Sequence, residues 1–305
     1  MGGSGKTPHV EYLINLLQYQ YKTAVLSRGY GRKTKGFLFA SSYATSQDIG
    51  DEPLQLYKKN SGAAVAVCED RVEGLRRISE KMPDIDVVIL DDAYQYLKLK
   101  CGLSIILTDY YLTYPRDYVF PVGNLRENPS AAADADIIIV TKSPKIISKI
   151  DEQLLLDKIK PLPHQKVYFS SIEYGELQPL TAAAAAISID NIHSVVTMSG
   201  IANPYLFLEY INRKYKEKQH LIFSDHHVFK KNDIENMVNS YNRAIMRSRV
   251  IITTEKDAMR LMTSDFWQFI VHLPIFTLPI EVKFHEKYRK DFDNQVKNYL
   301  GKKPH

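Results

Sequence analysis

The hydrophobic pattern of the first half of the chain predicts short buried strands that alternate with amphipathic helices. Helical spacing appears at Val10, Leu13, Ile14 and Leu17, and again over residues 54–57 and 72–79. Short, mostly β-branched runs have the length of buried strands: Thr23–Leu26, Ala64–Val67, Val87–Leu90, Ser104–Leu107 and Ile137–Val140. Strands that alternate with helices are typical of parallel βαβ units, so we expect an α/β fold with a parallel sheet.

The pattern changes at Pro161-Leu162-Pro163, where prolines and aromatic residues introduce a possible hairpin over Lys166–Ile172. A second αβ block follows, with helical spacing over 204–214 and 232–245 and a turn of surface helix at 182–186. Its expected strands are Val195–Met198, His220–Phe223, Val250–Thr253 and Phe269–His272. We therefore expect a first domain over residues 1–162, a linker over 163–180 and a smaller αβ domain over 181–305.

Length and composition agree with two domains and limit the partners. The chain has 305 residues, a net charge of +5 and a pI near 8.9, which favour an anionic partner such as a nucleotide, a phospholipid surface or a nucleic acid. Cys68 and Cys101 match no metal or redox spacing, so a reducing compartment is expected. We expect no membrane span and no signal peptide, because the apolar runs are too short.

The most informative motif is the opening stretch from Gly2 to Pro8, which reads Gly-Gly-Ser-Gly-Lys-Thr-Pro. Backbone N–H groups of such a P-loop surround phosphate oxygens, and the following helix points its positive end at the same anion. Lys6 would contact the β- and γ-phosphates, and the Thr7 hydroxyl would bind Mg²⁺. The expected nucleotide-binding residues are Gly2, Gly3, Ser4, Gly5, Lys6 and Thr7. Asp91 and Asp92, at the end of a buried strand, would supply the other side of the metal site.

Two alternatives accompany this motif. A glycine-rich cloning linker looks similar, but the helical pattern that follows directly favours the P-loop. The complete motif also has a buried strand before the loop. Nothing precedes Met1 in this sequence, so we expect either that the natural N-terminus lies upstream or that another strand fills that edge.

Other polar residues have a structural and a functional interpretation. Asp51, in Gly50-Asp51-Glu52-Pro53, could cap a helix or act as a general base for an alcohol acceptor. His226 follows a strand, where a structural role is common, but a His–Asp pair across an interdomain cleft is also possible. Arg28 and Arg32 lie in a basic loop that is either solvated or bound to phosphate. Thr254 could cap a helix or contact a ligand.

The ordered set of these motifs resembles the tetraacyldisaccharide 4′-kinases of lipid A biosynthesis from residue 2 to about residue 260. The motifs that carry the resemblance are 2–8, 27–32, 50–53, Asp91-Asp92 with Gln95, 123–127, Asp225-His226 and 254–258. The family is ATP-dependent and uses Mg²⁺. It phosphorylates the 4′-hydroxyl of a tetraacylated disaccharide 1-phosphate, which gives lipid IVA. A P-loop core and a smaller αβ domain are joined by a β-ribbon, which here would be 163–180.

The resemblance also implies residue roles. Asp51 would be the catalytic base, His226 its partner and Lys6 a catalytic cation, while Arg28, Arg32 and Arg126 could hold phosphate. The substrate would be the lipid A disaccharide precursor, met at the cytoplasmic face of the bacterial inner membrane by a peripheral enzyme. No nucleic-acid partner is expected, because no dense Lys/Arg stripe with interleaved aromatics is present. The resemblance says nothing of the oligomeric state.

Three differences from the family pattern stand out. Ala93 replaces a glycine directly after the metal carboxylates, and Tyr96 replaces a histidine, so we assign Tyr96 no catalytic role. Members also have an N-terminal extension in which an apolar helix leads into the first strand.

Two other functions compete with the kinase. A P-loop switch GTPase or ATPase would hydrolyse the nucleotide without phosphorylating an acceptor. Its guanine-reading residues are poorly matched, because Thr141-Lys142-Ser143-Pro144 has no carboxylate. A nucleic-acid-binding ATPase is favoured by the basic pI alone.

Overall fold

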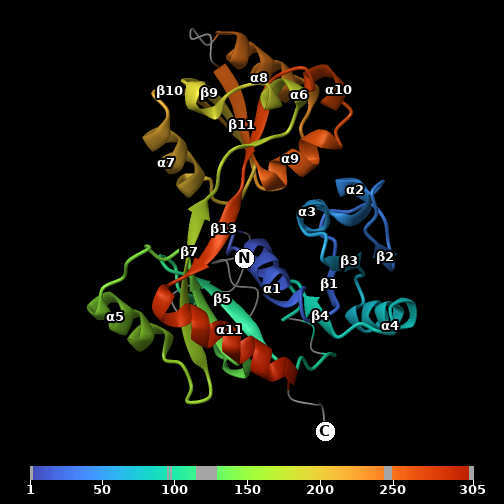
Figure 1. Cartoon of the computed structure of the whole chain (residues 1–305), viewed down its shortest axis with the longest axis vertical. Coiled ribbons are helices and arrows are strands. Elements are labelled where there is room, and N and C mark those ends of the chain that lie inside the picture. Colours follow the sequence, from blue (N-terminus) through green and yellow to red (C-terminus); the bar gives the residue numbers. More distant parts are fainter. Residues whose placement is uncertain (1–2, 95, 97, 115–128, 244–248, 302–305) are drawn as a thin grey trace.

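The computed structural model describes residues 3–94, 96, 98–114, 129–243 and 249–301. These residues form three sheets in two lobes, which Figure 1 shows one above the other. We call the lobe with the two four-stranded sheets the core lobe and the one with the five-stranded sheet the second lobe. Within the described ranges, none of the helices has the length and apolar content that crossing a bilayer requires.

The first sheet of the core lobe is buried on both faces. Its strands are β1 (Thr23–Ser27), β2 (Leu38–Phe39), β3 (Ala63–Val67) and β4 (Val87–Leu90), and its helices are α1 (Lys6–Leu17), α2 (Ser46–Ile49), α3 (Asp51–Lys59) and α4 (Arg71–Lys81). The order is β2-β3-β1-β4, and β1 pairs in parallel with β3 and β4. Val25 packs with Ile14 of α1, while its neighbour Leu26 packs with Ile78 of α4 on the opposite face. This explains why β1 is a continuous apolar run.

The second sheet of the core lobe has the order β13-β7-β6-β5. Its elements are β5 (Ile105–Asp109), β6 (Ile137–Thr141), β7 (Lys166–Tyr174), β13 (Ile280–Phe284), α5 (Lys149–Ile159) and α11 (Glu286–Gly301). β5, β6 and β7 are parallel, and β13 runs antiparallel to β7. The expected hairpin over Lys166–Ile172 is wrong, because this segment is one continuous strand. Its partners come from distant parts of the chain, so local sequence could not reveal the pairing.

An apolar cavity of about 620 Å³ separates the two sheets of the core lobe. Leu13 of α1, Ile89 of β4 and Leu107 of β5 contribute to its lining. Among the described strands, β4 pairs with β1 and β5 pairs with β6, and none lies between them. The expectation that another strand of this chain fills the edge beside the P-loop is therefore wrong for the described residues.

The second lobe is a five-stranded sheet with helices on both faces. Its elements are β8 (Gln178–Pro179), β9 (Ser194–Ser199), β10 (Glu217–Ile222), β11 (Arg249–Thr254), β12 (Ile275–Leu278), α6 (Ala182–Ala185), α7 (Tyr205–Lys214), α8 (Lys231–Arg243), α9 (Glu255–Met262) and α10 (Trp267–Ile270). The order is β10-β9-β11-β12-β8, with β8 antiparallel to β12. The strand expected at Phe269–His272 is wrong: α10 ends there and β12 follows. Periodicity alone does not separate a short buried helix from a strand.

A two-stranded ribbon joins the lobes (Figure 1). β7 carries the chain towards the second lobe and β13 brings it back, with Tyr174 opposite Ile280 and Ser170 opposite Phe284. After β13 the chain forms α11, whose Phe292 is buried among core-lobe residues. The segment from Ile280 to Gly301, which the sequence placed in the smaller domain, thus packs against the core lobe. The division at 162 and 180 stays a prediction.

Candidate active site

The loop before α1 contains two glycines in a left-handed backbone conformation. Gly3 and Gly5 have φ angles of 78° and 84°, a left-handed region that favours glycine. Gly5 is the N-cap of α1, so the first N–H groups of that helix and its positive dipole end are available to an anion. Thr141, at the end of β6, donates a hydrogen bond of 3.1 Å to the carbonyl of Ser4, which fixes the loop to the second sheet.

His9 also tethers the loop, and sequence reasoning missed it. Its Nδ1 lies 2.7 Å from the carbonyl oxygen of Gly5, and its Nε2 lies 3.0 Å from the Ser170 hydroxyl on β7. Burial lowers the pKa of His9 to about 4, which the Gly5 hydrogen bond opposes, so the ring is neutral at pH 7. A neutral ring that donates from Nδ1 and accepts at Nε2 satisfies both partners.

The carboxylates at the end of β4 lie beside Lys6. Lys6 Nζ is 3.2 Å from Asp92 Oδ1, and the Ser27 hydroxyl donates a hydrogen bond of 3.2 Å to Asp91 Oδ2. Burial and the charge of Asp92 raise the pKa of Asp91, while Lys6 opposes the rise. Thr7 follows Lys6 in α1. Paired carboxylates with a hydroxyl are the oxygen ligands that Mg²⁺ prefers, so Asp91, Asp92 and Thr7 fit this ion.

The two departures after Asp92 have a structural explanation. The left-handed backbone falls on Asp92, with φ 50°, and aspartate tolerates this conformation better than most residues. Ala93 is therefore accepted where the family has glycine. Tyr96 donates a hydrogen bond of 2.8 Å to Asp70, the N-cap of α4, which accounts for it without a catalytic role.

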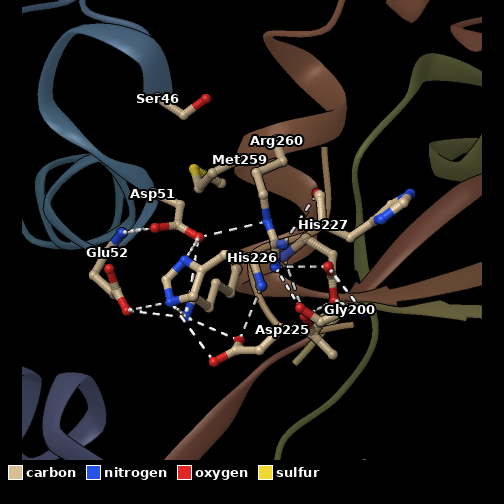
Figure 2. Close-up of polar contacts among 12 residues, drawn as sticks. Ser46, Asp51, Glu52, Gly200, Asp225, His226, His227, Met259 and Arg260 are labelled. Atoms are coloured by element: carbon tan, nitrogen blue, oxygen red, sulfur yellow. Dashed lines mark hydrogen bonds and ion pairs between the residues drawn. The ribbon is translucent and has the colours of Figure 1, made fainter. Parts of the chain in front are cut away.

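Asp51 and His226, predicted to meet across the lobes, lie in contact (Figure 2). His226 Nδ1 is 3.3 Å from Asp51 Oδ2. Asp51 begins α3 and is only 4% exposed; it follows Gly50, whose φ of 93° requires glycine. His226 lies in the turn after β10 and has a φ of 56°. The Tyr30 ring lies against the imidazole, with centroids 5.0 Å apart.

The charges around Asp51 keep it ionised. Burial alone would raise the pKa of Asp51, but the hydrogen bond from His226 and the charge of Lys256 hold it well below its usual value. The same hydrogen bond raises the pKa of His226, which burial opposes. Burial and the Asp51 charge raise the pKa of Glu52, and Lys256 opposes the rise. The site thus holds an ionised carboxylate that can accept a hydrogen bond.

Asp51, Glu52 and His226 are close enough together to ligate a cation. Lys256 already supplies one: its Nζ lies 2.9 Å from Glu52 and 3.1 Å from His226 Nε2. Because Nε2 of His226 accepts a hydrogen bond from Lys256, the neutral imidazole carries its proton on Nδ1, which faces Asp51. This arrangement favours a lysine ammonium over a metal ion at this position.

A protein-family model described as Tetraacyldisaccharide-1-P 4'-kinase matches residues 1–299. The chain belongs to this family. It is similar to proteins named Tetraacyldisaccharide 4'-kinase from Parabacteroides distasonis, at 40% identity over 98% of this chain and 85% of that protein, and Phocaeicola vulgatus, at 39% identity over 99% and 84%. It also resembles a crystal structure of LpxK from Aquifex aeolicus in complex with ATP, with a TM-score of 0.71 and 25% identity over 98% of this chain and 85% of that one.

The family match confirms the resemblance and the α/β fold, but the individual residue roles stay predictions. The Arg32 side chain is 3% exposed and pairs with Glu69 at 2.7 Å, so in this structure it holds its own loop. Arg28 is exposed. Gly2 and Arg126 lie outside the described residues. Thr254 caps α9 by accepting from Asp257 N–H at 3.1 Å, as the structural interpretation expected.

Arg71 and Arg260 are two further cations that the sequence reasoning did not select. Arg71 is buried and donates to the backbone carbonyls of Cys68 and Asp91, which supports the turn that carries Asp91 and Asp92. Arg260 Nε lies 3.4 Å from Asp51 Oδ2. The i, i+4 spacing of Lys256 and Arg260 on a helix that Thr254 caps was the available signal.

Proposed function

We propose that this chain is an ATP-dependent kinase that phosphorylates the 4′-hydroxyl of tetraacyldisaccharide 1-phosphate and so forms lipid IVA in lipid A biosynthesis. The family match over residues 1–299 supports the reaction. The observation that carries the mechanism is the contact between Asp51 and His226, which brings a buried carboxylate of one lobe to an imidazole of the other. A switch GTPase or ATPase needs no such base for an alcohol acceptor.

The loop residues Gly3, Ser4 and Gly5, with Lys6 and Thr7, would bind the ATP phosphates. The ATP complex of the Aquifex aeolicus protein supports the choice of nucleotide. Lys6 pairs with Asp92, so a bound phosphate would compete with this carboxylate for the ammonium. Exchange of one anion for another leaves the lysine charge compensated throughout.

Mg²⁺ would be held by Thr7, Asp91 and Asp92. When bound, it would neutralise part of the negative charge on the phosphates. The Ser27 hydroxyl would orient Asp91 through its 3.2 Å hydrogen bond.

Asp51 would orient the 4′-hydroxyl and accept its proton. Phosphoryl transfer passes through a loose transition state, in which the acceptor oxygen keeps its proton until late. A carboxylate with a lowered pKa is therefore adequate, because its first task is to align the hydroxyl by a charge-assisted hydrogen bond. His226 would hold Asp51 through Nδ1 and stabilise its ionised form.

The tetraacylated substrate resides in a membrane, so we propose that the chain acts as a peripheral protein at the cytoplasmic face of the inner membrane. The net charge of +5 favours an anionic lipid surface. Acyl-chain preference and oligomeric state are left open by this proposal.

The experiment that tests the function is incubation of the protein with γ-labelled ATP, Mg²⁺ and a tetraacyldisaccharide 1-phosphate in mixed micelles. We expect label at the 4′ position of the distal sugar, and little label when GTP replaces ATP. Release of labelled phosphate without a labelled lipid would overturn the kinase and favour the hydrolysing switch.

A further inference from the structure

Helix α9 directs two cations from the second lobe at the Asp51–His226 pair. Lys256 and Arg260 are four residues apart, which places them on one face of the helix, and Figure 2 shows Arg260 reaching towards Asp51. Thr254 caps the helix and Asp257 is wholly buried beneath it, so the first turn is held in place.

Arg260 contacts the Asp51 carboxylate and the backbone next to His226. One end of its guanidinium donates to Asp257 at 2.8 Å and to the Gly200 carbonyl at 2.9 Å. The other terminal nitrogen donates to the His227 carbonyl at 3.2 Å, next to His226. Its Nε faces Asp51 Oδ2 at 3.4 Å. One rigid side chain therefore spans the turn that carries the imidazole and the carboxylate of the opposite lobe.

Lys256 contacts the same pair from the other side. Its Nζ lies 3.1 Å from His226 Nε2 and 2.9 Å from Glu52, and within 4.0 Å of Asp51 and Asp225. It compensates three carboxylates that would otherwise repel one another in a half-buried space. A hydrogen bond from the ammonium to Nε2 also fixes the imidazole tautomer that donates to Asp51.

We propose that Lys256 and Arg260 are positioning residues that align Asp51 with His226 for the phosphoryl transfer. This inference rests on the proposed kinase function. Arg260 sets the geometry, because its planar fork fits several acceptors at once and a lysine cannot reproduce it. Lys256 sets the charge and the tautomer of the imidazole.

A simpler alternative is that α9 only holds the two lobes together. Lys59 of α3 provides the comparison, since its Nζ joins Glu11 of α1 at 2.7 Å to Glu255 of α9 at 2.9 Å. It links the same lobes through the same helix, but its ion pairs are with Glu11 and Glu255 rather than with the pair. A role in cohesion predicts that loss of Lys59 and loss of Arg260 have the same effect on turnover.

The pH dependence of turnover separates the two roles. Among the described residues, the charged groups within 4.0 Å of Asp51 or His226 are Glu52, Asp225, Lys256 and Arg260. The Tyr30 ring lies against His226, whereas His227 bonds to Asp233 and Asp257 bonds to Arg260. Removal of either cation raises the pKa of Asp51, so a larger fraction of the carboxylate is protonated at a given acidic pH. The acidic limb of the kcat/KM profile must then move to higher pH.

The experiment compares Arg260→Lys, Arg260→Gln, Lys256→Gln and the control Lys59→Gln. We expect kcat to fall about 10- to 100-fold in both Arg260 variants, with KM for ATP unchanged, because a small misplacement of the base is costly. Lys256→Gln should lower kcat and shift the acidic limb upwards. Lys59→Gln should lower the unfolding temperature and keep kcat and the pH profile. Wild-type kcat and profile in Arg260→Gln, or an equal kcat loss in Lys59→Gln, would overturn the proposal.

A readout that does not depend on turnover distinguishes failure of this inference from failure of the kinase. In NMR titrations of ring-labelled histidine, the pKa of His226 should rise in Lys256→Gln, because a neighbouring positive charge is lost, and stay constant in Lys59→Gln. An unchanged His226 titration in Lys256→Gln contradicts the positioning role. If the His226 titration shifts in Lys256→Gln but the wild-type protein labels no lipid, the contact of Lys256 with His226 is supported and the proposed kinase function is wrong.

Discussion

Substitution of Asp51 by asparagine is the sharpest test of the proposed base. The amide keeps the shape of the carboxylate, so the buried space beside His226 stays filled. The amide cannot accept a proton, and its nitrogen is a donor that would face two other nitrogens, Nδ1 of His226 and Nε of Arg260. A general base contributes roughly 10²- to 10⁴-fold to the rate, which corresponds to a barrier increase of about 3–5 kcal/mol.

The assay is the initial rate of 4′-phosphate formation at saturating ATP and lipid, together with calorimetric titration of ATP. We expect kcat to fall by that factor while ATP affinity is kept, because the P-loop contacts are untouched. Asp48→Asn is the matched control, since Asp48 lies three residues away and its carboxylate accepts from Thr45 in the cap of α2. It should cost about 1 kcal/mol of stability and leave kcat as it is. Turnover of Asp51→Asn close to that of the wild type would refute the assignment.

Three further predictions concern the partner, the loop tether and the C-terminal helix. His226→Ala should lower kcat and move the acidic limb of kcat/KM to higher pH, because the hydrogen bond that lowers the pKa of Asp51 is lost; an unmoved limb would contradict this. Neutral buried His9 has a folded pKa of about 4 against about 6.5 when unfolded, so the unfolded state binds more protons between these values. Urea unfolding should therefore show stability falling by about 3 kcal/mol from pH 7 to pH 4, and His9→Phe should lack this part of the slope. Phe292→Ala should cost about 3–5 kcal/mol, because the 1% exposed ring stacks on Phe284; a loss below about 1 kcal/mol would show that α11 does not complete the core lobe.

The sequence predicted the elements whose pattern is local. The strands around 23–27, 63–67, 87–90 and 137–141 are confirmed, because each is an apolar run between turn or helix signals. The ribbon escaped prediction because β7 and β13 pair across more than one hundred residues, and no local pattern encodes that pairing. The same distance in sequence hid the return of α11 to the core lobe.

For the candidate site, motifs located the residues to which we assign the chemistry, and the structure added residues that contact them. Lys6 with Asp92, and Asp51 with His226, were each expected to come together and do so. Arg260 was missed because its importance depends on a carboxylate about two hundred positions earlier in the chain. Sequence patterns report neighbours on one helix, whereas an inter-lobe contact depends on tertiary packing.

The ribbon of β7 and β13 bears on the contact between the proposed base, Asp51, and His226, because the two residues belong to different lobes. Both crossings of the chain run through this paired segment, so any separation of the two lobes would have to bend or twist β7 and β13. Such an excursion would carry the imidazole away from its carboxylate while leaving the nucleotide loop intact. A nucleotide bound at the loop before α1 would then lack the proposed base, so transfer to an acceptor would require the two lobes to be in contact. Ser170 lies on β7 and its hydroxyl bonds to His9, which also contacts the Gly5 carbonyl, so a displacement of β7 would also act on the loop before α1.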